Sequence, residues 1–172
     1  LRLVGSEMCI RDRYKILREQ GEEIRGLYER NDVKIRLLEG MEENKGWFAL
    51  AEAPEPGEPL TAIVENGIKY NVDVENGQKT GFFVDQRENR SLLERYAKDR
   101  SVLNMFCYTG GFSFYAMRGG AKLVHSVDSS AKAIDLTNKN VELNFPGDAR
   151  HEAFAEDAFK YLDRMGDQYD LI

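Results

Sequence analysis

The feature of the sequence that most constrains the fold is the segment from Val102 to Asp128. A short apolar run, Val102–Phe106, leads into the turn Tyr108–Gly111, and a helix-like segment, Phe112–Arg118, follows. A second apolar run, Leu123–Val127, ends on an aspartate. Continuous apolar runs are typical of parallel strands buried on both faces. The order strand, glycine turn, helix, strand and acid predicts a nucleotide-binding βαβ unit.

The glycine spacing indicates which nucleotide such a unit would take. A dinucleotide site uses the pattern G-x-G-x-x-G, because a pyrophosphate must lie on the helix N-terminus. Here Gly110 and Gly111 are adjacent, and Gly119 comes too late to serve as the third glycine. Asp128 follows Gly110 at close to the ~20 residues expected of an acid that accepts both ribose hydroxyls. A ligand with ribose and adenine but no phosphate fits this pattern, and S-adenosylmethionine is such a ligand.

The residues before this unit predict a small α+β module, residues 14–78, after a leader, residues 1–13, that is non-native or disordered. We expect a helix over Tyr14–Arg30 and strands at Val33–Leu37 and Trp47–Ala51. The clearest local signal is a hairpin whose arms, Thr61–Glu65 and Ile68–Val74, flank Asn66-Gly67. Asn-Gly favours a two-residue hairpin turn because both central residues need φ > 0.

The segment from Gly77 to Arg90 is dense in functional side chains. Its Lys79-Thr80 pair lacks the glycine spacing of a phosphate-binding P-loop, and we reject that interpretation. Asp85 is expected to be the N-cap of a helix over residues 86–99. Arg87 and Arg90 suit bidentate pairing with a carboxylate or phosphate, although an exposed first helical turn explains them equally well.

Downstream of Asp128 the pattern repeats. We expect a helix over Ser129–Asn144, a strand over Ala149–Ala155 and a helix over Ala158–Met165, with a fourth apolar run at Tyr169–Ile172. Asp157 could bond an adenine amino group at the third strand tip, although a plain N-cap role is the simpler interpretation. The fold class is therefore α/β, an incomplete Rossmann-like parallel sheet over residues 79–172 that follows the small α+β module.

Composition limits the alternatives. The formal net charge of −6 argues against this segment alone binding nucleic acid strongly. An apolar run near 18 residues is absent, so we expect no membrane span. Cys9 and Cys107 form neither a metal-binding spacing nor a disulfide framework, which favours a reducing cytoplasm and no metal. His125 lies within an apolar run and is expected to be a packed core residue.

Two stretches together, Lys79–Arg87 and Val102–Phe112, resemble the class I S-adenosylmethionine-dependent methyltransferases that form 5-methylcytosine in 23S ribosomal RNA. In that family a PUA domain, a small α+β domain and a Rossmann-like catalytic domain follow in order, and the resemblance covers residues 14–172. The resemblance implies S-adenosyl-L-methionine as cofactor and ribosomal RNA as partner, with a homodimer left open. It implies cofactor contacts from Phe106, Tyr108, Thr109, Gly110, Gly111, Asp128, Ser129, Asp157, Ala158, Lys79, Phe82, Asp85 and Arg87.

The sequence departs from the family pattern at both ends. The PUA domain, the Asp-Pro-Pro segment and the catalytic cysteine are absent, so the nucleophile is expected beyond Ile172, and the chain is expected to be an inactive fragment. Cys107 does not match that cysteine and is expected to be a small buried hydrophobe. Three alternatives stay open: an NAD-dependent oxidoreductase, a non-catalytic RNA-binding module, and a methyltransferase of the same fold with another RNA or a protein as substrate.

Overall fold

The computed structural model describes residues 7–24, 26–47, 59–165 and 168–172. Within this part of the chain two compact units can be distinguished. The first comprises residues up to Thr61 together with Asp73–Gly81, and the second comprises Ala62–Val72 and Phe82–Ile172. In the described residues, no helix is long and apolar enough to cross a membrane.

The described part of the first unit contains two helices and a two-stranded antiparallel sheet. Its elements are α1 (Glu7–Glu19), β1 (Tyr28–Asn31), α2 (Ile35–Leu38) and β2 (Asn44–Trp47). β1 pairs with β2 so that Tyr28 lies opposite Trp47, and their rings meet edge to face at 5.1 Å between centroids. Such aromatic cross-strand pairs stabilise short hairpins.

The predicted helix over Tyr14–Arg30 is wrong at both ends. Helix α1 already begins at Glu7, inside the segment expected to be a non-native or disordered leader, and it ends at Glu19. Gly21 follows with a φ of +84°, a left-handed conformation that ends a helix readily at glycine. Tyr28, near the predicted C-terminus, belongs instead to β1, where it pairs with Trp47 of β2.

The predicted strand Val33–Leu37 is also wrong, because α2 forms a single helical turn there. Gly40, with a φ of +72°, donates its N–H to the carbonyl of Leu37 and closes this turn. Five alternating residues are too few to distinguish a strand from one helical turn. The predicted strand at Trp47–Ala51 overlaps β2 only at Trp47, and its other residues lie outside the described ranges.

The Asn66-Gly67 hairpin is confirmed. Strands β3 (Leu60–Glu65) and β4 (Ile68–Asp73) pair in a two-stranded sheet. Asn66 and Gly67 have φ values of +49° and +83°, as the predicted turn requires. Most of this hairpin, Ala62–Val72, belongs to the second compact unit rather than to the unit that precedes it in sequence.

The second unit follows the predicted α/β order closely. After the hairpin its elements are η1 (Val84–Gln86), α3 (Arg87–Tyr96), β5 (Ser101–Met105), α4 (Gly111–Arg118), β6 (Leu123–Asp128), α5 (Ala131–Asn144), β7 (His151–Ala155) and α6 (Ala158–Met165). The element boundaries differ from the predicted ones by a few residues. The expected α/β fold with a parallel sheet is confirmed.

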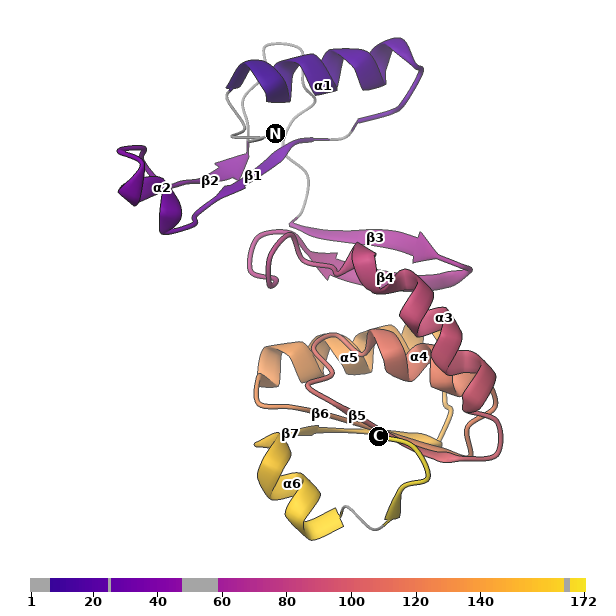
Figure 1. Ribbon diagram of the computed structural model, residues 1–172. Helices are drawn as coiled ribbons and strands as arrows, with labels where there is room; N and C mark the ends of the chain where they lie inside the picture. Colours follow the sequence, from indigo (N-terminus) through magenta and orange to yellow (C-terminus); the bar gives the residue numbers. More distant parts are fainter. Residues whose placement is uncertain (1–6, 25, 48–58, 166–167) are drawn as a thin grey trace. The chain divides into compact units, whose positions relative to one another are not determined.

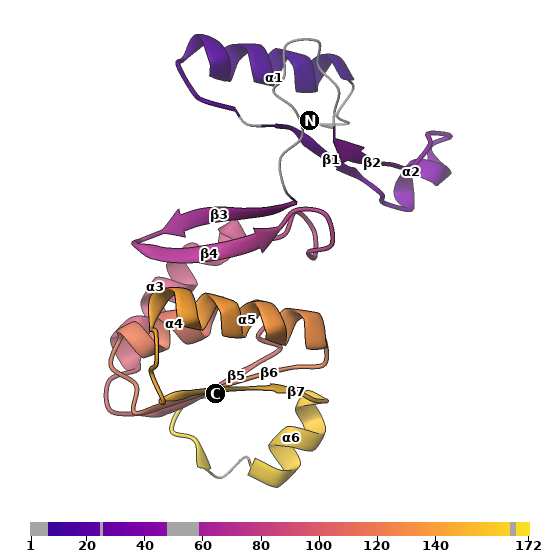
Figure 2. The ribbon, with the colours of Figure 1, turned by 180° about the vertical axis from the view of Figure 1, so that it is seen from behind.

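The sheet of the second unit has β6 at its centre. β5 and β7 pair with β6 in parallel, and Leu171 forms a further parallel bridge to Val102 on the outer side of β5. Helices α4 and α5 cover one face of this sheet and α6 covers the other (Figures 1 and 2). Because the strands are parallel, the residues that follow β5, β6 and β7 meet at one edge.

The side chain of Asp170 holds the last described segment against β5. One carboxylate oxygen accepts hydrogen bonds from the backbone N–H and the hydroxyl of Ser101, at 2.8 and 2.9 Å. These bonds, with the ammonium group of Lys122 at 3.2 Å, lower the pKa of Asp170 to about 2. This aspartate therefore lies at the amino end of β5, opposite the edge where the strand tips meet.

Candidate functional site

The turn between β5 and α4 has an unusual backbone. Phe106, Tyr108 and Gly110 all adopt positive φ, at +55°, +50° and +81°. Only glycine takes this conformation without strain, so two non-glycine residues are held there by their surroundings. Gly110 is also sterically required, because an added Cβ would lie 2.7 Å from a methyl carbon of Thr137 and 2.8 Å from the ring of Phe114.

Asp128 at the tip of β6 fixes this turn. One carboxylate oxygen accepts the N–H of Tyr108 at 2.9 Å, and the other accepts the N–H of Ser130 at 2.9 Å. The neighbouring N–H of Cys107 donates to the carbonyl of Val127 at 3.0 Å, so the turn continues the pairing of β5 with β6. Asp128 is half-buried and joins two strand tips. Ser129 beside it is exposed, while Ser130 is the N-cap of α5.

The tip of β7 carries the other predicted acid. One carboxylate oxygen of Asp157 accepts the N–H of Lys160 at 3.0 Å, so this side chain acts as the N-cap of α6. Ala158 is buried beneath it in a core cluster with Leu103 and Tyr161. The predicted N-cap role of Asp157 is therefore confirmed. The side chain is also exposed, so a ligand can reach it.

The sequence analysis missed Phe159. Its ring is 66% exposed and meets the ring of Phe106, itself 64% exposed, at 6.0 Å between centroids. Large exposed aromatic rings are uncommon unless they meet a ligand or partner. The signal was present in the sequence, since Phe159 follows Asp157-Ala158 at a predicted strand tip.

Two side chains of the segment from Gly77 to Arg90 are buried in the core. Phe82 is buried against Tyr70, with ring centroids 4.8 Å apart. Arg90 is buried as well and makes a bidentate ion pair with Glu65 on β3, at 2.8 and 2.7 Å. It also donates to the carbonyl of Phe83. The predicted bidentate pairing of Arg90 with a carboxylate therefore occurs, and the carboxylate is that of Glu65 within the protein. Arg90 does not lie in an exposed helical turn.

Two other residues of this segment are exposed. The prediction that Asp85 caps the helix is wrong, because Asp85 lies within η1 and the N-cap of α3 is Gln86, which makes no side-chain capping bond. The 3-10 turn moves the helix start beyond the reach of Asp85. Arg87 is exposed and pairs with its neighbour Glu88. Lys79 belongs to the first compact unit, where it adopts a φ of +51°.

Cys107 lies within the turn but is poorly suited to nucleophilic chemistry. Its side chain is buried, and burial, together with the negative charge of Asp128, raises the pKa of the thiol to about 12. The thiolate is the reactive form, so this cysteine is unreactive near neutral pH. Its interpretation as a small buried hydrophobe agrees with this environment.

The expectation that His125 is a packed core residue also agrees with the structure. The ring is 8% exposed, and Nδ1 lies 2.9 and 2.7 Å from the hydroxyls of Tyr161 and Tyr169. Burial lowers the pKa of this histidine. Among the described residues, no group of three or more histidine, cysteine, aspartate or glutamate side chains could hold a metal.

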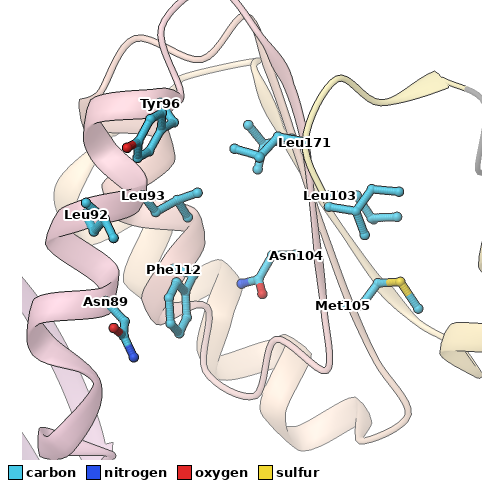
Figure 3. Close-up of a pocket in the computed structure, with 11 residues that line it drawn as sticks. Asn89, Leu92, Leu93, Tyr96, Leu103, Asn104, Met105, Phe112 and Leu171 are labelled. Carbon is cyan, nitrogen blue, oxygen red and sulfur yellow. The ribbon is translucent and has the colours of Figure 1, made fainter.

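A pocket of about 510 Å³ lies between α3 and the outer edge of β5. Figure 3 shows Leu92, Leu93 and Tyr96 of α3 on one side of it and Leu171 on the other. Its lining is mainly apolar, with amide groups from Asn89 and Asn104. Neither Asp128 nor Asp157 lines it, so this pocket does not offer the acids that a ribose or an adenine amino group would need.

The residues at the strand tips fit a nucleoside ligand without phosphate. A carboxylate stands at the tip of the central strand, exposed aromatic rings lie near the β7 tip, and Gly110 allows the turn to pack closely against α4 and α5. A model of the S-adenosylmethionine-dependent methyltransferase family matches residues 49–172, which is most of the chain. This chain belongs to that family.

Individual methyltransferases support the same placement. The chain is 46% identical over 151 residues to the ribosomal RNA large subunit methyltransferase I of Tolumonas auensis, and 47% identical over 138 residues to that of Pseudoalteromonas translucida. These alignments cover 85% and 79% of the chain but only 37% and 33% of the relatives. The chain thus spans about a third of their length.

Solved structures agree with the fold. A structure from Streptococcus mutans assigned as a SAM-dependent methyltransferase matches 94% of the chain and 41% of its own, at 30% identity and a TM-score of 0.73. A SAM-dependent methyltransferase from Agrobacterium tumefaciens matches 74% of the chain and 42% of its own, at 27% identity and a TM-score of 0.64. Family membership also removes the support for the NAD-dependent oxidoreductase alternative.

Proposed function

We propose that this chain carries the cofactor-binding part of a methyltransferase that modifies large-subunit ribosomal RNA. The relatives that are 42–47% identical over the aligned residues are named for that activity. The single observation that carries the proposal is the geometry of Asp128, which holds the β5 turn at the tip of β6. When bound, S-adenosylmethionine supplies a methyl group activated by a positively charged sulfur.

We propose that Asp128 accepts the ribose hydroxyls. Each carboxylate oxygen already accepts one backbone N–H, from Tyr108 and Ser130, which fixes the carboxylate plane. A carboxylate oxygen can accept more than one hydrogen bond, so both oxygens retain capacity toward the open edge. The backbone donors thus orient the acid before a ligand arrives. Ser129, exposed beside it, is proposed to lie next to the ribose.

The adenine is proposed to lie near the tip of β7. Asp157 would accept the adenine amino group, and the backbone of Ala158 would contact the ring. The exposed ring of Phe159 provides an apolar surface on which a base can stack. Replacing Phe159 by Ala should weaken cofactor binding about fivefold to tenfold, whereas Phe159→Tyr should retain it.

The methionine end is assigned by the family resemblance. The residues proposed for the methionine and ribose part are Phe106, Tyr108, Thr109, Gly110 and Gly111 of the turn, with Phe82, Asp85 and Arg87 of the preceding segment at the methionine end. Phe82 acts through packing, since its side chain is buried. The proposed target atom is C5 of cytosine. That chemistry needs a cysteine thiolate to add to C6 of the base, and Cys107 does not supply it.

Titration calorimetry on the 172-residue chain tests the proposal. We expect S-adenosylhomocysteine to bind and NAD not to bind, and we expect Asp128→Ala to abolish the binding. Labelled S-adenosylmethionine with ribosomal RNA should give binding without methyl transfer, because we propose that the nucleophile lies outside residues 1–172. RNA binding that is insensitive to Asp128→Ala and to cofactor would instead favour the non-catalytic RNA-binding alternative.

A further inference from the structure

Helix α5 presents a buried polar side chain to the turn between β5 and α4. Thr137 is completely buried, and its hydroxyl donates toward two carbonyl oxygens, that of Ala133 at 2.9 Å and that of Tyr108 at 3.0 Å. A threonine within a helix commonly bonds the carbonyl four residues earlier, as it does here with Ala133. The contact with Tyr108 is different, because it joins the helix to a loop that follows another strand.

Tyr108 is one of the two non-glycine residues of the turn that need support from their surroundings. It holds a φ of +50° without being glycine, a left-handed conformation that brings its Cβ too close to the backbone. Its N–H is fixed by Asp128 at 2.9 Å and its carbonyl oxygen by Thr137 at 3.0 Å. The two side chains therefore fix opposite sides of the same residue, one from the tip of β6 and one from α5.

The polar face of α5 is itself anchored. Asn140 and Asn144 follow Thr137 on the same side of the helix, three and seven residues later. The amide of Asn140 accepts the N–H of Asn71 on β4 at 2.7 Å, and that of Asn144 accepts the N–H of Lys69 at 2.8 Å. Their amide nitrogens donate back to the carbonyls of the same two residues. Thr137 thus projects from a helix that the hairpin holds in register.

We propose that Thr137 is a positioning residue for the cofactor site, through its hydrogen bond to the carbonyl of Tyr108. It keeps the turn in the conformation in which Asp128 is fixed and oriented toward the ligand. The expected effect of Thr137 on ligand binding rests on the cofactor function proposed above. Its effect on the conformation of the turn can be measured without a ligand.

Two substitutions separate the hydroxyl of Thr137 from its methyl group. Thr137→Val keeps the methyl carbon that packs against Gly110 and removes the donor, whereas Thr137→Ser keeps the donor and removes the methyl. Asn144→Ala is the control for a general loosening of α5, since it removes hydrogen bonds to the hairpin at the far end of the same helix.

The first measurement is amide hydrogen exchange by NMR on the 172-residue chain without ligand. In Thr137→Val we expect exchange at the N–H of Tyr108 to accelerate about fivefold to tenfold, while the amide of Val124 in the sheet core is unchanged. Thr137→Ser and Asn144→Ala should leave Tyr108 within about twofold of the original rate. Equal rates at Tyr108 in the original chain and in Thr137→Val would overturn the proposal, as would equal acceleration in all three variants.

The second measurement is calorimetry with S-adenosylhomocysteine. Thr137→Val should weaken binding about fivefold to tenfold, and Thr137→Ser should restore it. If the original chain does not bind this ligand, the proposed cofactor function of the chain fails, while the exchange experiment still decides the role of Thr137. Normal exchange at Tyr108 together with weakened binding in both variants would assign Thr137 a packing role and reject the hydrogen bond.

Discussion

Asp128 and Asp157 both lie where a parallel strand leads into a helix: Asp128 is the last residue of β6, and Asp157 follows β7 by two residues. Their environments differ. Asp128 is half-buried and accepts N–H groups from two different loops, whereas Asp157 is exposed and accepts an N–H from its own helix. β6 is the central strand, so the turn after β5 can reach its tip. The position of a strand in the sheet therefore decides whether an acid at its tip organises the site or caps a helix.

The largest effect should come from Gly110→Ala, which disrupts the turn that Asp128 holds. The added Cβ would lie 2.7 Å from Thr137 and 2.8 Å from Phe114, on a backbone with a φ of +81°. We expect a loss of about 2–5 kcal/mol of unfolding free energy, measured by urea denaturation. Gly147→Ala is the matched control, because Gly147 has a φ of +71° with no atom within 4 Å of an added Cβ. Equal losses in both variants would mean that the turn is not tightly packed.

Replacement of Asp128 should have the next largest effect. Asp128→Ala leaves two backbone N–H groups without their acceptor, so we expect S-adenosylhomocysteine affinity to fall at least 100-fold by calorimetry.

Asp128→Asn sharpens this test. It keeps the shape but places an NH₂ group against the N–H of either Tyr108 or Ser130. Its affinity should therefore lie between those of the original chain and Asp128→Ala, and full affinity in the Asn variant would contradict a role for the charged carboxylate.

Asp157 should give a smaller effect that has two components. Asp157→Ala removes the cap of α6, at a cost of ~1 kcal/mol, and we expect cofactor affinity to fall about tenfold. Asp157→Ser retains a capping oxygen, so it should restore stability but not affinity. If Asp157→Ser recovers both the stability and the cofactor affinity, Asp157 acts only as a helix cap. Asp128 would then be the only one of these two acids that contacts the cofactor.

The smallest effect on binding should follow Cys107→Ala. Because burial raises the pKa of the thiol to about 12, alkylation at pH 8 should be slow in the folded chain and fast in urea. In the unfolded chain the thiol ionises near its ordinary pKa of 9.0, so Cys107 stabilises the fold below pH 9 and this contribution is lost as the pH rises toward 12. Cofactor affinity should change less than twofold. A large loss of affinity with normal stability would contradict a purely structural role.

The features predicted correctly from the sequence are turns and strands whose conformation depends on residues adjacent in the chain. The Asn66-Gly67 turn, the glycine turn after β5 and the strand that ends at Asp128 were found because glycine and apolar runs carry local signals. The strand at Val33–Leu37 was mispredicted because five alternating residues also fit one helical turn.

The contacts that position the site join residues far apart in sequence. Arg90 reaches Glu65, Asn140 reaches Asn71, and Thr137 reaches Tyr108. Nothing in the local pattern around Arg90 distinguishes an internal ion pair from an exposed anion site. Asp85 illustrates the same limit, since a 3-10 turn of three residues moved the helix start past the predicted cap.

The asparagine contacts between α5 and β4 have a consequence for assembly. An exposed strand edge is a template on which another chain can add a strand. Residues four apart on a helix rise about 6.0 Å and residues two apart on a strand about 6.8 Å, so two carboxamides can match two successive peptide groups of an edge. Asn140 and Asn144 thus occupy the outward groups of Asn71 and Lys69 as a third strand would. The helix thus covers the outer edge of β4, where another chain could otherwise add a strand, and opposes a one-residue slip of this strand.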